Sequence, residues 1–160
     1  MNPKIIQAQA LAFANDQMQH RIPQWNVLGR PEQNPPDGDW SVWAYIAGRG
    51  AGKTRSGSEW VHNQVLNGSK RIALVAPTSA DCRDVIVEGE SGILATAQPS
   101  RLPLYEPSKR RLTWRNGAIA TLYSAEEPDR LRGVQHDAAW ADELAAWKNP
   151  QTGDMLLLGL

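Results

Sequence analysis

A glycine-rich segment between an apolar run and a helix-forming run constrains the fold of this chain more than any other feature. The segment at 47–54 reads AGRGAGKT and matches the phosphate-loop pattern, with alanine in its first place. The run before it at 40–47, WSVWAYIA, reads as a buried strand, and a helix is expected over 56–66. This order predicts an α/β fold of the P-loop type, with a mainly parallel sheet flanked by helices.

The residues of this loop have expected roles in binding a nucleotide. The glycines let backbone N–H groups face phosphate oxygens, and the following helix adds its positive dipole end. Lys53 is expected to reach the β- and γ-phosphates of ATP, and the Thr54 hydroxyl to coordinate Mg²⁺. The alternative is a glycine-rich turn that carries a lysine by chance. The predicted nucleotide-binding residues of the loop are Gly48, Arg49, Gly50, Ala51, Gly52, Lys53 and Thr54.

A phosphate loop needs a second, acidic site, and the segment DAAWADE at 137–143 supplies one. Asp142 is expected to hold the metal at the end of a strand, directly or through water. Glu143 is expected to polarise the water that attacks the γ-phosphate. Because alanines are weak strand formers, propensity alone also allows 138–146 to be a solvated acidic helix.

The other apolar segments continue the α/β alternation. A short strand is predicted at 71–76 and a helix over 80–88. A hairpin is predicted from 112 to 123, because Asn116-Gly117 suits a tight type I′ turn between its two strands.

Two regions are expected along the chain. Residues 1–39 combine a helix over 2–20 with a proline-rich, irregular crossing at 30–39, and residues 40–160 form the core. The sequence stops inside an apolar run near 155–158 without a capping signal. We therefore expect a fragment.

Composition excludes several classes of protein. Seventeen basic residues balance seventeen acidic ones, so no overall positive field attracts nucleic acid. The single cysteine, Cys82, excludes an internal disulfide, and neither a secretory signal nor a bilayer-spanning run is visible. A cytoplasmic protein is expected. The seven tryptophans are expected to pack in the core and at its rim.

A local basic cluster lies around Tyr105 and Trp114. Such a cluster on or beside a hairpin suits contact with DNA phosphates, and a solvated charged hairpin is the alternative. Its members are Arg101, Lys109, Arg110, Arg111 and Arg115.

These motifs together resemble a known family, the large terminase subunits of tailed phages and of phage-like gene-transfer agents. The stretches that carry the resemblance are RPEQNPPDGDW, AGRGAGKTRSGSEWV, RIALVAPTSADCRDVIVEGESGIL and the run from YEPSKRRLTW to ADELAAW. The resemblance implies an ATPase of the additional-strand catalytic-glutamate class, which drives double-stranded DNA into a capsid. It also implies that Asp142 and Glu143 form the acidic pair.

The resemblance assigns roles to two further residues near the nucleotide. Gln33 resembles the glutamine that reads the adenine ring, although it is equally a polar residue in a proline-rich crossing. Arg49 resembles a basic residue placed to interact with the charge of the γ-phosphate. The alternative is that Arg49 is a solvent-exposed arginine of the loop.

Packaging ATPases of this kind act as rings, in which one subunit inserts an arginine at its neighbour's γ-phosphate. The segment DRLRG at 129–133 offers Arg132 as the first candidate and Arg130 as the second. The alternative is that Arg132 pairs locally with Asp129 or Glu127.

The resemblance further implies a homo-oligomeric ring when full length, with portal or prohead and a small terminase subunit as partners. The family's coupling segment and nuclease domain are not found before Leu160, so no cutting activity is expected. In this class the strand that carries the coupling segment lies between the loop strand and the acidic strand, so the sheet is expected to be incomplete. The remaining alternatives are a helicase-like translocase and an inactive, truncated prophage product.

Overall fold

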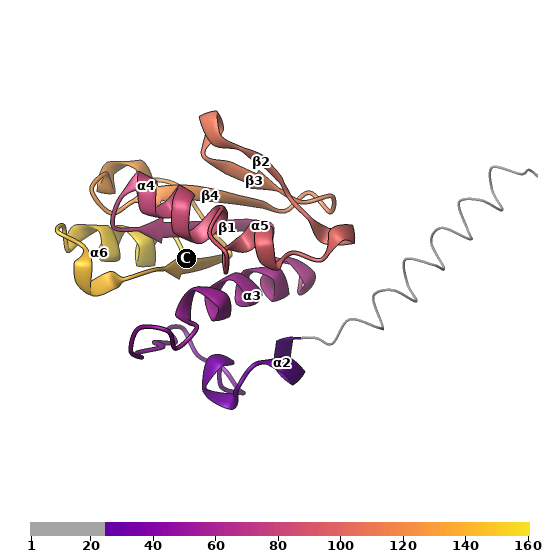
Figure 1. Cartoon of the computed structure of the whole chain (residues 1–160). Helices are drawn as coiled ribbons and strands as arrows, with labels where there is room; N and C mark the ends of the chain where they lie inside the picture. The colour runs from indigo at the N-terminus through magenta and orange to yellow at the C-terminus, as the bar shows by residue number, and fades with distance from the viewer. Residues whose placement is uncertain (1–24) are drawn as a thin grey trace, which may run out of the picture. The chain divides into compact units, whose positions relative to one another are not determined.

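The computed structural model describes residues 25–160 (Figure 1), and the chain divides into two compact units that meet after Trp43. The first unit contains helix α2 (Trp25–Leu28) and a 3-10 turn, η1 (Pro31–Gln33). Irregular chain follows, as predicted for the proline-rich crossing. The helix expected over 2–20 lies outside the described residues.

The second unit, Ala44–Leu160, is built on a five-stranded sheet with the order β2-β3-β4-β1-β5. β1 pairs in parallel with β4 and β5, while β3 pairs antiparallel with β4 and β2 pairs antiparallel with β3. The strands are β1 (Arg71–Ala76), β2 (Leu104–Glu106), β3 (Arg111–Thr113), β4 (Ile119–Ser124) and β5 (Ala138–Ala141). The strand predicted at 71–76 is confirmed, and the alanine-rich segment before the acidic pair is a strand and not a helix.

Helices cover both faces of this sheet (Figure 1). One face packs against α3 (Lys53–Leu66), the π-helix η2 (Cys82–Val87) and α5 (Ile93–Thr96). The short helix α4 (Ser79–Asp81) leads directly into η2 and buries no residue. The other face packs against α6 (Gln151–Leu158) and a 3-10 turn, η5 (Pro128–Leu131). The helix predicted over 80–88 is therefore present, but most of it is π-helical. No helix in residues 25–160 is long and apolar enough to cross a membrane.

The apolar sequence of β1 follows from this double cover. Ile72 and Leu74 point into the larger core, which α3, η2 and α5 close. Ala73 and Val75 point into the smaller core on the face of α6 and η5. A strand that is covered on both faces has no solvent side, which explains its unbroken apolar run.

The prediction of a strand at 40–47 is wrong. None of these residues pairs with the sheet, and Val42 and Ile46 are 68% and 92% exposed. An apolar segment becomes a strand only when a neighbour pairs with its backbone groups, and both sides of β1 are taken by β4 and β5. Within the described residues β5 forms the edge of the sheet.

The hairpin is confirmed, but its turn is not type I′. Gly117 has φ 84°, whereas Asn116 does not have the positive φ that type I′ requires at both central residues. The Trp114 amide donates to Ala118 O at 2.9 Å, and the Gly117 amide donates to Trp114 O at 3.0 Å. These bonds define a three-residue loop, in which a turn is followed by a glycine in the left-handed region.

Candidate functional site

The glycine loop ends where α3 begins. Gly50 and Gly52 have φ values of 77° and 81°, which a glycine adopts without strain, and Gly52 caps the helix. The helix starts at Lys53, one turn before its predicted start, so its free N–H groups lie at the loop. The Tyr45 hydroxyl donates to Ala51 O at 3.1 Å and braces the loop from its N-terminal side.

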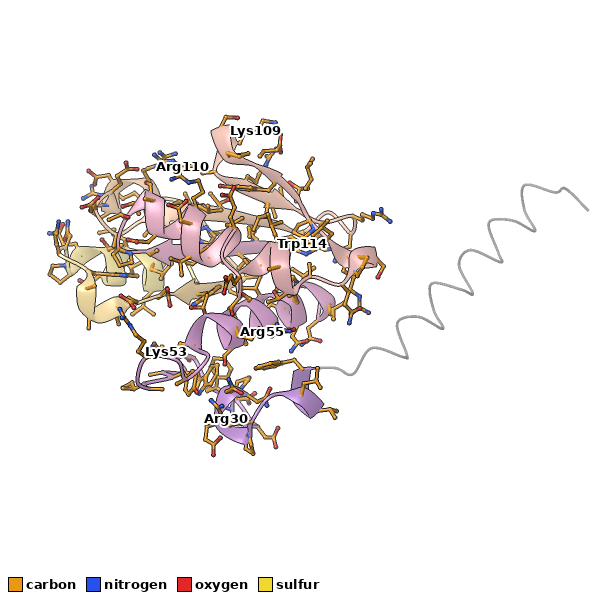
Figure 2. All side chains as sticks on the ribbon, viewed as in Figure 1. Arg30, Lys53, Arg55, Lys109, Arg110 and Trp114 are labelled. Atoms are coloured by element: carbon orange, nitrogen blue, oxygen red, sulfur yellow. The ribbon has the colours of Figure 1, made fainter. Side chains whose placement is uncertain are left out.

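Lys53 folds back over the loop (Figure 2). Its Nζ donates to the carbonyl oxygens of Ala47 at 3.0 Å and Gly48 at 3.2 Å. Carbonyl groups are neutral partners for an ammonium, so phosphate oxygens can replace them with a gain in charge attraction. Thr54 is the next residue of α3 and is partly buried, while Arg49 is exposed on the loop.

The acidic pair lies at the carboxyl end of β5. The Asp142 amide donates to Val75 O at 2.8 Å, which extends the pairing of β1 and β5 by one residue. Burial raises the pKa of Asp142, the neighbouring Glu143 charge raises it further, and the Lys53 charge lowers it. The helix that begins at Lys53 packs against β5, which ends just before Asp142, so the two predicted motifs lie on neighbouring elements.

The chain turns sharply at Glu143. This residue is exposed and has φ 46°, in the left-handed region. The turn is closed by the Ala146 amide, which donates to Glu143 O at 2.8 Å. The Trp147 indole Nε1 donates to Asp142 O at 2.9 Å. Trp147 stands in no sequence motif that would indicate this contact.

The arginines of the segment at 129–133 make local ion pairs. Arg132 Nε lies 2.9 Å from Asp129 Oδ1, and the Arg132 side chain is 64% exposed. Arg130 lies 3.4 Å from Glu127. The local pairing that the sequence left open is thus present, and it is too exposed to hold Arg132 firmly.

Gln33 belongs to the first unit, where it is buried in the η1 turn. Its Oε1 accepts the Arg30 amide at 2.9 Å, so the amide side chain is held by local backbone.

The basic cluster near the hairpin carries its own counter-charges. Arg110 pairs with Glu127 at 3.0 Å, and Arg111 pairs with Glu106 at 3.0 Å. Lys109 also pairs with Glu106. These two carboxylates offset part of the positive charge of the cluster.

The site suits a nucleotide-bound magnesium better than a metal held by protein alone. Among residues 25–160 no three His, Cys, Asp or Glu side chains gather as a metal site. Mg²⁺ in nucleotide sites commonly takes only one or two protein ligands, and phosphate and water oxygens supply the rest. Thr54, which follows Lys53 in α3, and Asp142, at the end of the neighbouring strand β5, fit that arrangement.

Comparisons with known proteins agree with this architecture. A family model described as "Terminase large subunit, T4likevirus-type, N-terminal" matches residues 44–157. Among solved structures, the chain is similar to the large terminase ATPase domain of Thermus phage P74-26, with 20% identity and a TM-score of 0.51. The match covers 69% of this chain and 53% of that one, so the present chain spans about half its length. No curated protein matches the sequence.

Proposed function

Because the chain belongs to the terminase large subunit family, T4-like virus type, N-terminal part, we propose that it binds ATP with Mg²⁺ and hydrolyses it to power the packaging of double-stranded DNA. The observation that carries this proposal is the packing of α3, which begins at the loop lysine, against β5, which ends at the acidic pair. Burial raises the pKa of Asp142, and the Lys53 charge lowers it. A glycine loop, its helix and a facing carboxylate form the minimal set for phosphoryl transfer.

In the proposed reaction each residue has one task. The loop N–H groups and Lys53 bind the phosphates and offset their charge, and Thr54 and Asp142 hold the metal. Mg²⁺, when bound there, would offset the negative charge of the phosphates. Glu143 takes a proton from water as the water oxygen bonds to the γ-phosphorus. The bond from that phosphorus to the bridging oxygen breaks, and ADP keeps the electron pair.

Three further roles and the partners belong to the same proposal. Gln33 contacts the adenine ring, Arg49 faces the γ-phosphate, and Arg132 acts at the site of a neighbouring subunit in a ring. Duplex DNA, a portal or prohead and a small terminase subunit are the partners. The bacterial host cytoplasm is the compartment.

Nucleotide binding is tested by thermal unfolding with and without Mg²⁺ and ATP, together with release of phosphate. Ligand at about a hundredfold excess over its Kd stabilises the bound state by about 2.7 kcal/mol, so a clear rise in Tm is expected. Lys53→Ala should lose both the rise and the turnover. Lys70→Ala is the matched control, because this lysine contacts Asn116 O at 2.9 Å, at the opposite end of β1 from the site. Equal protection of the wild type and Lys53→Ala would rule out the loop assignment.

A further inference from the structure

The left-handed turn at Glu143 needs an explanation, because an ordinary side chain adopts this conformation at a cost. Among the described residues other than glycine, only Arg110 and Glu143 have positive φ. The left-handed region costs about 1–2 kcal/mol for a residue with a Cβ. Such a conformation persists only where surrounding contacts hold it, and it is often found at functional sites.

Trp147 makes the contact that is best placed to hold this turn. Its Nε1 donates to Asp142 O at 2.9 Å. That oxygen belongs to the peptide plane between Asp142 and Glu143. The peptide group is planar and rigid. A hydrogen bond to its oxygen therefore restricts the two backbone rotations beside the plane, ψ of Asp142 and φ of Glu143. One hydrogen bond thereby helps to set the directions in which both side chains leave the backbone.

The indole ring is itself anchored. It packs against the smaller core on the face of α6. The core residues in that cluster are Ala73, Val75, Tyr123, Leu131 and Leu156. The indole N–H group of Trp147 therefore belongs to a ring that packs against residues of β1 and β4.

We propose that Trp147 is the positioning residue of the acidic pair, which sets the directions of Asp142 and Glu143 through the peptide that joins them. This inference rests on the proposed function. Trp147 touches neither the nucleotide nor the metal in this role. Groups that orient metal ligands commonly change metal affinity or activity by about 10–100-fold when they are lost.

The test replaces the indole by a ring that lacks the N–H group. Trp147→Phe keeps an aromatic ring in the smaller core and removes the donor. Trp60→Phe is the matched control, because Trp60 is also partly buried, and its Nε1 is buried without a hydrogen-bond partner. The two variants share the loss of ring area and differ in the loss of the bond.

Without nucleotide, the backbone conformation at Glu143 is followed by NMR chemical shifts and the coupling between its amide and Hα protons. We expect Trp147→Phe to move Glu143 out of the left-handed region and Trp60→Phe to leave it there. Unchanged Glu143 signals in Trp147→Phe would overturn the inference whether or not the chain binds ATP.

With ATP, the same variants are compared for kcat, KM and the Mg²⁺ concentration that supports half-maximal turnover. Trp147→Phe should lower kcat and raise the Mg²⁺ requirement, each by about tenfold or more, because both carboxylates lose their direction. KM for ATP should change little, since the loop contacts remain. Losses of equal size in both variants would show that only packing matters and would overturn the inference. Failure of the wild type to bind Mg²⁺ and ATP would instead overturn the proposed function, and the Glu143 signals would still decide the role of Trp147.

Discussion

Asp142 and Glu143 are adjacent carboxylates in unlike surroundings. Asp142 is partly buried and its pKa is raised by burial, whereas Glu143 is exposed. A desolvated carboxylate gains from a nearby positive charge, because such a charge favours its ionised form. This difference supports the predicted division of labour, with the metal at Asp142 and the water at Glu143.

His62 should make the stability of the chain depend on pH. This histidine of α3 lies 3.0 Å from the Thr96 hydroxyl of α5, and burial lowers its pKa to about 4. In the unfolded chain its pKa is about 6.5, so the unfolded state takes up a proton first as the pH falls. The contribution of neutral His62 to the free energy of unfolding is complete above about pH 6.5. It is lost as the pH falls to about 4, by roughly 3 kcal/mol in all.

Urea unfolding between pH 7 and pH 4 measures this effect. His62→Gln cannot take up the proton, so its free energy of unfolding should fall less over the same range. His136, whose pKa burial also lowers, is present in both proteins and cancels in the comparison. Identical pH profiles would contradict the assignment.

The sequence was most informative where a residue's role depends on its chain neighbours. Lys53, Asp142 and Glu143 stand in short motifs, and the structure brings the loop and the acidic segment together. Trp147 had no such signal. Its bond to Asp142 exists because the chain reverses at Glu143, and glutamate has no preference for the left-handed region that would reveal the turn.

At the scale of elements, prediction succeeded where local pattern decides the structure and failed where a neighbour decides it. The strand at 71–76 is apolar along its length and lies between two strands. The segment at 40–47 has a similar pattern, but within residues 25–160 no strand pairs with it. Periodicity reports which residues prefer burial and cannot report whether a pairing partner is present.

The close approach of α3 to β5 depends on Gly57. A Cβ at this position would lie 2.2 Å from Cε2 of Trp140, the buried tryptophan of β5. Gly57→Ala should therefore force the helix and the strand apart and destabilise the fold by about 1–3 kcal/mol, as overpacked cores do. Because α3 carries Lys53 and β5 leads to Asp142, the affinity for Mg²⁺ and ATP should fall as well.

Gly153→Ala in α6 is the control for this experiment. A Cβ there meets nothing within 4 Å, so the same change should be neutral or stabilise by up to about 1 kcal/mol. Chemical denaturation of both variants gives the comparison, and adding Trp140→Leu to Gly57→Ala should recover part of the loss. If Gly57→Ala is as stable as Gly153→Ala, the contact does not limit the packing.

At the scale of the whole molecule, the proposal that Arg132 serves a neighbouring subunit predicts behaviour that a single subunit cannot show. Arg132→Ala should leave ATP binding nearly unchanged and reduce turnover by about 10³-fold or more in the assembled packaging protein. Its exposed pair with Asp129 is weak enough to be exchanged for a phosphate.

Mixed assemblies distinguish this role from a local one. Subunits with Arg132→Ala and subunits with Glu143→Ala are each inactive alone, but a mixture forms interfaces in which each subunit supplies what the other lacks. Steady-state ATP hydrolysis should therefore rise above both parents and peak near equal mixing. Mixtures that never exceed their parents, or normal turnover in Arg132→Ala alone, would exclude the assignment.

The contact between Gly57 and Trp140 also has a consequence for evolution. The indole occupies the space that a side chain at position 57 would need, so the two positions cannot drift independently. A lineage that replaces Gly57 by alanine must replace Trp140 by a smaller residue, either beforehand or at the same time. Related sequences should therefore pair glycine at the first position with a large residue at the second, and a larger residue at the first with a small one at the second.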